Sequence, residues 1–203
     1  MTETGREPPR RRLAILLSGR GSNFSAIADA VESGAIPRAE IVAVLSDAPT
    51  APGLDLARRR GLPARVIARD AHATRREHEA SLLRELEPLR PDLLCLAGYM
   101  RILSPDFVRR YRSRILNIHP SLLPAHPGLE PQRRALEAGD PFAGCTVHFV
   151  DEGTDSGPVV LQARVPVLPD DTPETLSARI LEAEHRLYPE AIARVLEELA
   201  PGC

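Results

Sequence analysis

Residues 13–31 read LAILLSGRGSNFSAIADAV, and this stretch decides the fold class. Its first five residues are all apolar, which predicts a buried strand at 13–17. A loop rich in glycine and serine follows. Apolar side chains then recur at Phe24, Ile27 and Val31, with the spacing of an amphipathic helix. A strand, a short loop and a helix in this order form a βα unit, which is typical of a mostly parallel sheet.

The same pattern recurs along the chain. Further short apolar runs lie at 41–45, 64–67, 93–97 and 115–118, with helical patterns at 54–60, 74–86 and 105–111. This alternation predicts an α/β fold of the Rossmann-like kind, in which helices flank a mostly parallel, twisted sheet.

The pattern changes late in the chain. Two apolar runs at 145–150 and 158–167 surround the acidic turn 151–157, which predicts an antiparallel hairpin. The sequence Asp171-Thr172-Pro173-Glu174 then has the features of a helix N-terminus, so we expect a final helix to about residue 199, interrupted only at Tyr188-Pro189.

A chain of 203 residues is long enough to form one α/β domain with its own core. We expect residues 1–11, which are polar and rich in arginine, to be a disordered extension, and residues 12–203 to be a single domain. No apolar stretch has the length of a signal peptide or a membrane span. We therefore expect a cytoplasmic protein without a membrane partner.

Charge and composition exclude several classes of function. The 26 basic and 28 acidic residues are spread along the chain and give a net charge of −2, so a nucleic-acid partner is not expected. The chain has no lysine, which excludes a Schiff base and a Walker A lysine. Its cysteines, Cys95, Cys145 and Cys203, are scattered, and its histidines lack metal-ligand spacing. We therefore expect neither disulfides nor a metal.

The first loop, Ser18-Gly19-Arg20-Gly21-Ser22-Asn23, lies between a predicted strand and a predicted helix. Free backbone N–H groups and the helix dipole favour an anion there, and a phosphate is the natural candidate. Phe24 occupies the place of the third glycine of a dinucleotide fingerprint, so a dinucleotide is disfavoured. The loop alone leaves open an ordinary glycine-rich turn.

A second polar group follows the strand at 115–118. Asn117 and His119 are two residues apart, so their side chains point to the same side of the strand. The carboxyl ends of parallel strands line the ligand crevice, where an amide and an imidazole would suit an oxyanion site. Two hydrogen-bonded groups that merely cap the strand remain the alternative. His148 is interpreted as a structural histidine, and Asp155 on turn propensity alone as a solvated turn acid.

Longer motifs carry a resemblance to a known family. Residues 117–124 read NIHPSLLP and residues 144–151 read GCTVHFVD, and with the turn to residue 158 they resemble the folate-dependent formyltransferases. The resemblance covers nearly the whole chain. The motifs Gly21-Ser22-Asn23, AGYMRIL at 97–103 and EHRLYP at 184–189 are similar to the family members that formylate phosphoribosylglycinamide.

The resemblance implies a reaction and a set of site residues. The reaction is transfer of the formyl group of 10-formyltetrahydrofolate, a co-substrate, to the amino group of 5'-phosphoribosylglycinamide in purine biosynthesis. The implied partners are small molecules, and a homodimer is left open. The implied site residues are Asn117, His119 and Asp155 for catalysis, Gly21, Ser22, Asn23 and Glu184 for the acceptor, and Arg76, Met100, Arg101, Ile102, Leu103 and Asn117 for the folate.

Physical chemistry agrees with the implied trio. Attack of an amine on a formyl carbon creates an oxyanion and a cationic nitrogen. Asn117 and His119 can stabilise the first, and His119 with Asp155 can move the proton. A carboxylate beside the imidazole is expected to raise its pKa.

Two kinds of rival remain. Methionyl-tRNA formyltransferase and formyltetrahydrofolate hydrolase would use the same trio, but they resemble longer chains with an additional domain. A folate- or nucleotide-binding module without activity would have no need of all three polar groups. The sequence departs from the family at Glu130-Pro131-Gln132, where relatives often carry a histidine, so one substrate-contacting loop is uncertain.

Overall fold

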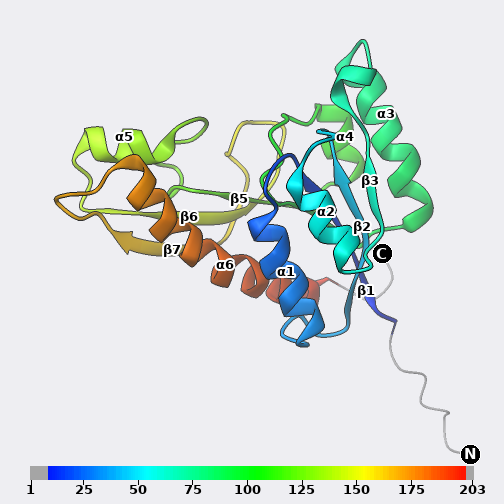
Figure 1. Ribbon diagram of the computed structural model, residues 1–203, viewed down its shortest axis with the longest axis horizontal. Coiled ribbons are helices and arrows are strands. Elements are labelled where there is room, and N and C mark those ends of the chain that lie inside the picture. The colour runs from blue at the N-terminus through cyan, green and yellow to red at the C-terminus, as the bar shows by residue number, and fades with distance from the viewer. Residues whose placement is uncertain (1–8, 200–203) are drawn as a thin grey trace, which may run out of the picture.

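The computed structural model describes residues 9–199. A seven-stranded sheet crosses the molecule in the order β3-β2-β1-β4-β5-β6-β7, as Figure 1 shows. Its strands are β1 (Arg11–Leu17), β2 (Ala39–Ser46), β3 (Ala64–Val66), β4 (Leu93–Leu96), β5 (Ile115–His119), β6 (Phe142–Phe149) and β7 (Val159–Pro166). The first five run parallel, whereas β6 is antiparallel to β5 and β7. The α/β class and the late hairpin are therefore confirmed.

Helices cover both faces of the sheet. They are α1 (Ser22–Glu32), α2 (Pro52–Arg59), α3 (Arg75–Leu86), α4 (Pro105–Arg110), α5 (Pro131–Ala138) and α6 (Pro173–Glu198), with short 3₁₀ turns at Arg69–Ala71 and Glu87–Leu89. One apolar core joins α1, α2 and α6 to one face of the sheet, and a second joins α3 and α4 to the other. Each helix buries the apolar stripe that its sequence predicts.

The strand order explains where a ligand can bind. The chain winds from β1 outward to β2 and β3, and then returns to β4 on the other side of β1. Neighbouring crossovers therefore diverge between β1 and β4, and the loops that follow these strands open a crevice at the carboxyl edge of the sheet. The predicted phosphate loop follows β1, and residues 97–104 follow β4.

The long helix α6 ties the two parts of the sheet together. It packs across the hairpin of β6 and β7 and reaches β5 (Figure 1). Pro189 lies inside it, but the helix continues to Glu198 without the interruption that the sequence led us to expect. The fully buried Tyr188 donates its hydroxyl to the carbonyl oxygens of Leu96 and Leu116, at 3.2 and 3.0 Å. The helix is thus joined to β4 and β5 just before both strands enter the crevice.

Two boundaries differ from those expected. Strand β1 begins at Arg11, inside the segment expected to be disordered, while residues 1–8 and 200–203, including Cys203, lie outside the described residues. The short helix α5 has no counterpart among the predicted elements, and it covers the departure at residues 130–132.

Candidate active site

A cleft of about 550 Å³ opens at the carboxyl edge of the sheet. Three segments line it: the loop after β4, the end of β5 with the loop that follows, and the turn between β6 and β7. Asn117, His119 and Asp155, which are far apart in the sequence, all border this cleft. The structure thus brings the three predicted catalytic residues together.

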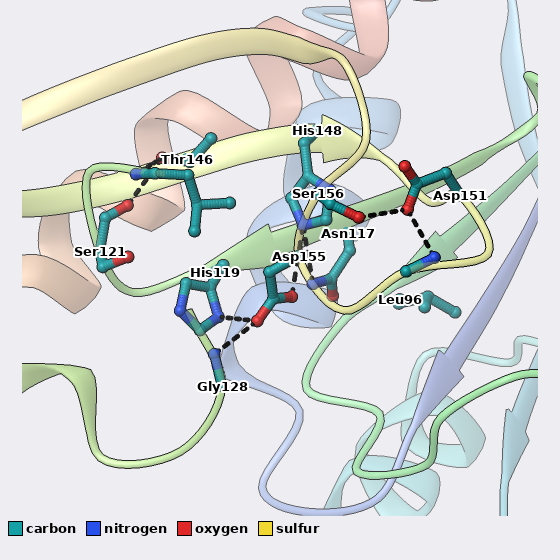
Figure 2. Close-up of polar contacts among 12 residues, drawn as sticks. Leu96, Asn117, His119, Ser121, Gly128, Thr146, His148, Asp151, Asp155 and Ser156 are labelled. Carbon is teal, nitrogen blue, oxygen red and sulfur yellow. Dashed lines mark hydrogen bonds and ion pairs between the residues drawn. The ribbon is translucent and has the colours of Figure 1, made fainter. Parts of the chain in front are cut away.

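Strand β5 positions Asn117 and His119, and its pairing with β6 adds a third side chain. The register places Asn117 opposite His148 and His119 opposite Thr146. Directly opposed residues of an antiparallel pair share one face of the sheet. His148 therefore borders the cleft beside Asn117, although its spacing indicated only a structural role (Figure 2).

The turn after β6 delivers the carboxylate of Asp155. The Asp151 side chain organises this turn by accepting hydrogen bonds from the Gly153 N–H at 3.0 Å and the Ser156 hydroxyl at 2.8 Å. Asp155 itself has a φ of 52°, the left-handed region that Asp tolerates better than most residues. A Cβ at Gly157 would lie 1.9 Å from the carbonyl oxygen of Phe149, so only glycine fits where the turn rejoins the sheet.

Backbone and ring nitrogens surround the Asp155 carboxylate. Oδ2 accepts a hydrogen bond of 2.8 Å from the Gly128 N–H and lies 3.4 Å from His119 Nδ1, while Oδ1 lies 3.6 Å from His148 Nε2 (Figure 2). Burial opposes the ionisation of Asp155, but the contacts with His148, Gly128 and His119 outweigh it and hold the pKa of this carboxyl below its ordinary value. Asp155 is therefore an anion at neutral pH.

The ring of His119 is oriented by a backbone carbonyl. Nε2 lies 3.0 Å from the carbonyl oxygen of His126, which can only accept, so Nε2 carries the hydrogen. In the neutral ring, Nδ1 is then an unprotonated base that faces Asp155. The His119 side chain is only 8% exposed.

The Asp155 carboxylate does act to raise the His119 pKa, as expected, but the net shift is a lowering. Burial lowers the pKa of this imidazole below its ordinary value, and the His126 carbonyl and the Asp155 charge offset that effect only in part. The sequence indicates a carboxylate near the ring but not how little water reaches it. At neutral pH the ring is neutral and can accept a proton.

His148 fixes the amide of Asn117. The Nδ1 of His148 lies 2.9 Å from the Phe149 carbonyl oxygen and must donate to it, which leaves Nε2 as an acceptor in the neutral ring. The Asn117 amide nitrogen lies 3.2 Å from that Nε2 and donates one hydrogen to it. The second N–H of Asn117 stays available to an oxygen in the cleft.

The predicted phosphate loop adopts a conformation that suits an anion. Gly21 is the residue before α1, with a φ of 76°, and no side chain caps the helix there. The loop lies close against α2, because a Cβ at Gly21 would be 2.7 Å from the Cα of Gly53. The first N–H groups of α1 therefore have no side-chain acceptor, and no acidic residue lies in the first turn.

Asn23 and Glu184 meet beneath this loop. The amide of Asn23 donates to Glu184 Oε2 at 2.7 Å, and both residues are buried. Burial raises the pKa of the Glu184 carboxyl, and the hydrogen bond from Asn23 opposes the rise only in part. Glu184 is therefore a buried acid and not part of the solvent-exposed face of α6. Neither residue lines the cleft of the trio.

The predicted folate residues divide between two cavities. Met100, Arg101, Ile102 and Leu103 line the cleft of the trio, and the side chains of Met100 and Ile102 are exposed. Arg76 instead lines a neighbouring cavity of about 670 Å³ between α3 and α4. Within residues 9–199, no group of three or more His, Cys, Asp or Glu side chains is placed to hold a metal ion. No helix in the described part of the chain is long and apolar enough to cross a bilayer.

Two residues at the site were not identified from the sequence. His148 contacts both Asn117 and Asp155, and its alternation with Val147 and Phe149 would have revealed this if the register of β5 and β6 had been known. Asp47 follows β2 and connects the loops after β1 and β4. The sequence feature that could have identified Asp47 is its position directly after the buried strand β2.

The mostly parallel sheet with a polar cleft at its carboxyl edge has the architecture of an α/β enzyme, and the family comparison narrows this class. Residues 11–192 match the formyl transferase family, and the chain belongs to that family.

Within this family, the chain is similar to enzymes that are named for the formylation of phosphoribosylglycinamide. The chain is 44% identical to phosphoribosylglycinamide formyltransferase of Escherichia coli over 181 residues, which are 89% of this chain and 85% of the relative. The crystal structure of the enzyme of that name from Brucella melitensis is 49% identical, with a TM-score of 0.88, and the match covers 96% of this chain and 100% of that one. Glycinamide ribonucleotide transformylase 1 from Symbiobacterium toebii superposes with a TM-score of 0.90 at 48% identity, over 94% of this chain and 90% of that one.

A longer relative also matches. The trifunctional purine biosynthetic protein adenosine-3 of Drosophila melanogaster is 49% identical over 192 residues, which are 94% of this chain. The chain spans 14% of the length of that relative.

Proposed function

We propose that the protein transfers the formyl group of 10-formyltetrahydrofolate to the amino group of 5'-phosphoribosylglycinamide. The observation that carries the proposal is the geometry of the trio: Nδ1 of His119 lies 3.4 Å from the Asp155 carboxylate, and the Asn117 amide, which is held by His148, borders the same cleft. A base and an oxyanion donor are the two groups that amine attack on a formyl carbon requires. The names of the relatives and the family match support the choice of substrates.

The roles of the trio follow from their atoms. The amine nitrogen bonds to the formyl carbon, and Asn117 donates its second N–H to the resulting oxyanion. The proton released by the nitrogen passes to Nδ1 of His119, and the imidazolium forms an ion pair with Asp155 while stabilising the negative oxygen. Collapse of the intermediate breaks the bond from the formyl carbon to the folate nitrogen, and the same proton passes to that leaving nitrogen.

The two substrates would bind at different loops. The uncapped N–H groups at Gly21, Ser22 and Asn23 suit the phosphate of the acceptor, and the Asn23–Glu184 pair lies below them for its polar groups. Residues 100–103 give the cleft an exposed apolar wall, which suits the folate ring system.

An acceptor competition tests the proposal. The chain is supplied with 10-formyltetrahydrofolate and either 5'-phosphoribosylglycinamide, free glycinamide or water alone, and tetrahydrofolate and the formylated product are both measured. We expect rapid transfer to the phosphorylated acceptor and a large loss of kcat/KM with free glycinamide. Release of formate at the same rate with and without acceptor would indicate a hydrolase and contradict the proposal.

A further inference from the structure

Residues 98–103 form one wall of the cleft without belonging to a helix or a strand. Met100 and Ile102 are 69% and 67% exposed, so little packing holds their side chains. A wall of this kind needs polar anchors if it is to keep one shape for a rigid ligand. The hydrogen bonds of Met100 and Arg101 provide these anchors.

Both of these residues are connected to Asp47 by hydrogen bonds. The Met100 N–H donates to the Ser18 hydroxyl at 2.8 Å, and that hydroxyl donates its own hydrogen to Asp47 Oδ1 at 2.5 Å. The neighbouring Arg101 donates its Nε–H to Asp47 Oδ2 at 2.6 Å. Each carboxylate oxygen thus fixes one of two consecutive residues of the wall.

The Asp47 side chain is 1% exposed, whereas that of Arg101 is 50% exposed. A buried carboxylate requires a charged or hydrogen-bonding partner, and the bond to Arg101 supplies one. A half-exposed arginine has water as an alternative and has no such need. The buried Asp47 carboxylate is therefore the fixed member of the pair, and its hydrogen bonds hold the wall in position.

The other end of the wall has a separate anchor of a different kind. Glu79 on α3 accepts hydrogen bonds from the Ser104 N–H, at 2.7 Å, and from the Ser104 hydroxyl. Ser104 is the N-cap of α4, so this contact holds a helix end rather than a residue that lines the cleft. Asp47 alone of these two acids reaches residues of the cleft.

We propose that Asp47 is a positioning residue for the formyl donor, acting through Ser18 and Arg101 on the cleft wall at residues 98–103. The inference rests on the proposed function, because the wall is taken as the donor's subsite. Asp47 touches no reacting atom in this arrangement. Its loss should weaken donor binding and leave the trio intact.

Steady-state kinetics with both substrates tests the role. Asp47→Asn keeps an acceptor for Ser18 but removes the charge that holds Arg101, and Ser18→Ala removes the link to Met100 while leaving the pair with Arg101. We expect each change to raise the donor KM about tenfold and to keep kcat and the acceptor KM within about twofold.

Asp55→Asn is the matched control, because Asp55 forms an exposed pair with Arg58 on α2, away from the cleft. It should leave all kinetic constants unchanged. Losses confined to thermal stability, with a wild-type donor KM in both Asp47→Asn and Ser18→Ala, would overturn the positioning role. If Asp47→Asn does not fold, Ser18→Ala decides by the same measurement. A wild-type chain that transfers no formyl group would overturn the proposed function instead.

Discussion

The burial of the His119 ring and the carboxylate of Asp155 have opposite effects on the pKa of His119. Burial lowers it and Asp155 raises it, with burial the larger effect. Asp155→Asn removes the raising effect, so the pKa of His119 should fall further and the acid limb of the kcat profile should move to lower pH. The value of kcat itself should fall by about 100-fold, the usual scale for acid–base groups. The measurement is kcat against pH between about 5 and 9.

The variant is well suited to this test because Asn, like Asp, tolerates the left-handed φ of position 155. The His119→Ala variant should lose a similar factor, and the two changes together should be little worse than the worse one, since residues that act as a unit are not additive. An acid limb that stays in place, or losses that multiply, would refute the coupled roles of His119 and Asp155.

Residue spacing predicted part of this site. Asn117 and His119 are two apart on a strand, and that fact alone places them on one side. Asp155 could be joined to them only through the resemblance, because it lies 36 positions after His119, in the turn between β6 and β7. The direction of the His119 pKa was beyond the sequence, since it depends on burial by the loop at 126–128 and the turn at 151–157.

At the scale of single elements, the N-terminus of α6 combines several stabilising contacts. The Thr172 hydroxyl accepts from the Thr175 N–H, the Thr175 hydroxyl accepts from the Thr172 N–H, and Asp171 pairs with Arg179. Thr172→Ala removes the cap and should lower the free energy of unfolding by about 1 kcal/mol. Urea unfolding followed by circular dichroism measures it.

Thr50→Ala provides the comparison, because Thr50 is an exposed loop residue. It should change the unfolding free energy by less than about 0.5 kcal/mol. Equal midpoints for the wild type and Thr172→Ala would show that the cap does not contribute to the stability of α6.

The periodicity of apolar residues predicted the strands and the long helices, but it did not predict α5. Residues 131–138 read PQRRALEA, with only Pro131 and Ala135 buried, so the apolar stripe is too short to detect. The signals were instead positional: a proline at the first turn and Gly139 directly after the end. Strand order was likewise inaccessible, because local patterns give each element but not its neighbour in the sheet.

Across the whole molecule, Glu184 links folding to pH. Its carboxyl has a raised pKa because it is buried, so its contribution to stability is present in full below its unfolded pKa of 4.5 and is lost as the pH rises through the folded value. Glu184→Gln removes this dependence and leaves the size unchanged. The amide can also donate to Asn23 Oδ1, which is buried without a partner among the described residues.

We therefore expect the variant to gain stability relative to the wild type as the pH rises from about 4 to 8, by about 1.4 kcal/mol for each unit by which the folded pKa exceeds its ordinary value. Chemical denaturation at several pH values gives the difference directly. A difference that is constant with pH would mean that Glu184 titrates alike in the folded and unfolded chains.

The position of the hairpin has a consequence for synthesis on the ribosome. When translation has reached residue 150, six of the seven strands have been made, together with Asn117, His119 and the loop at residues 18–23. Asp155 and α6 are still to come, and Tyr188 has not yet joined β4 to β5. The nascent polypeptide thus acquires its binding loops early and its chemistry late. On the proposed function, the trio can be complete only after the turn at residues 151–157 has been made, and Tyr188 can join β4 to β5 only after α6 has followed.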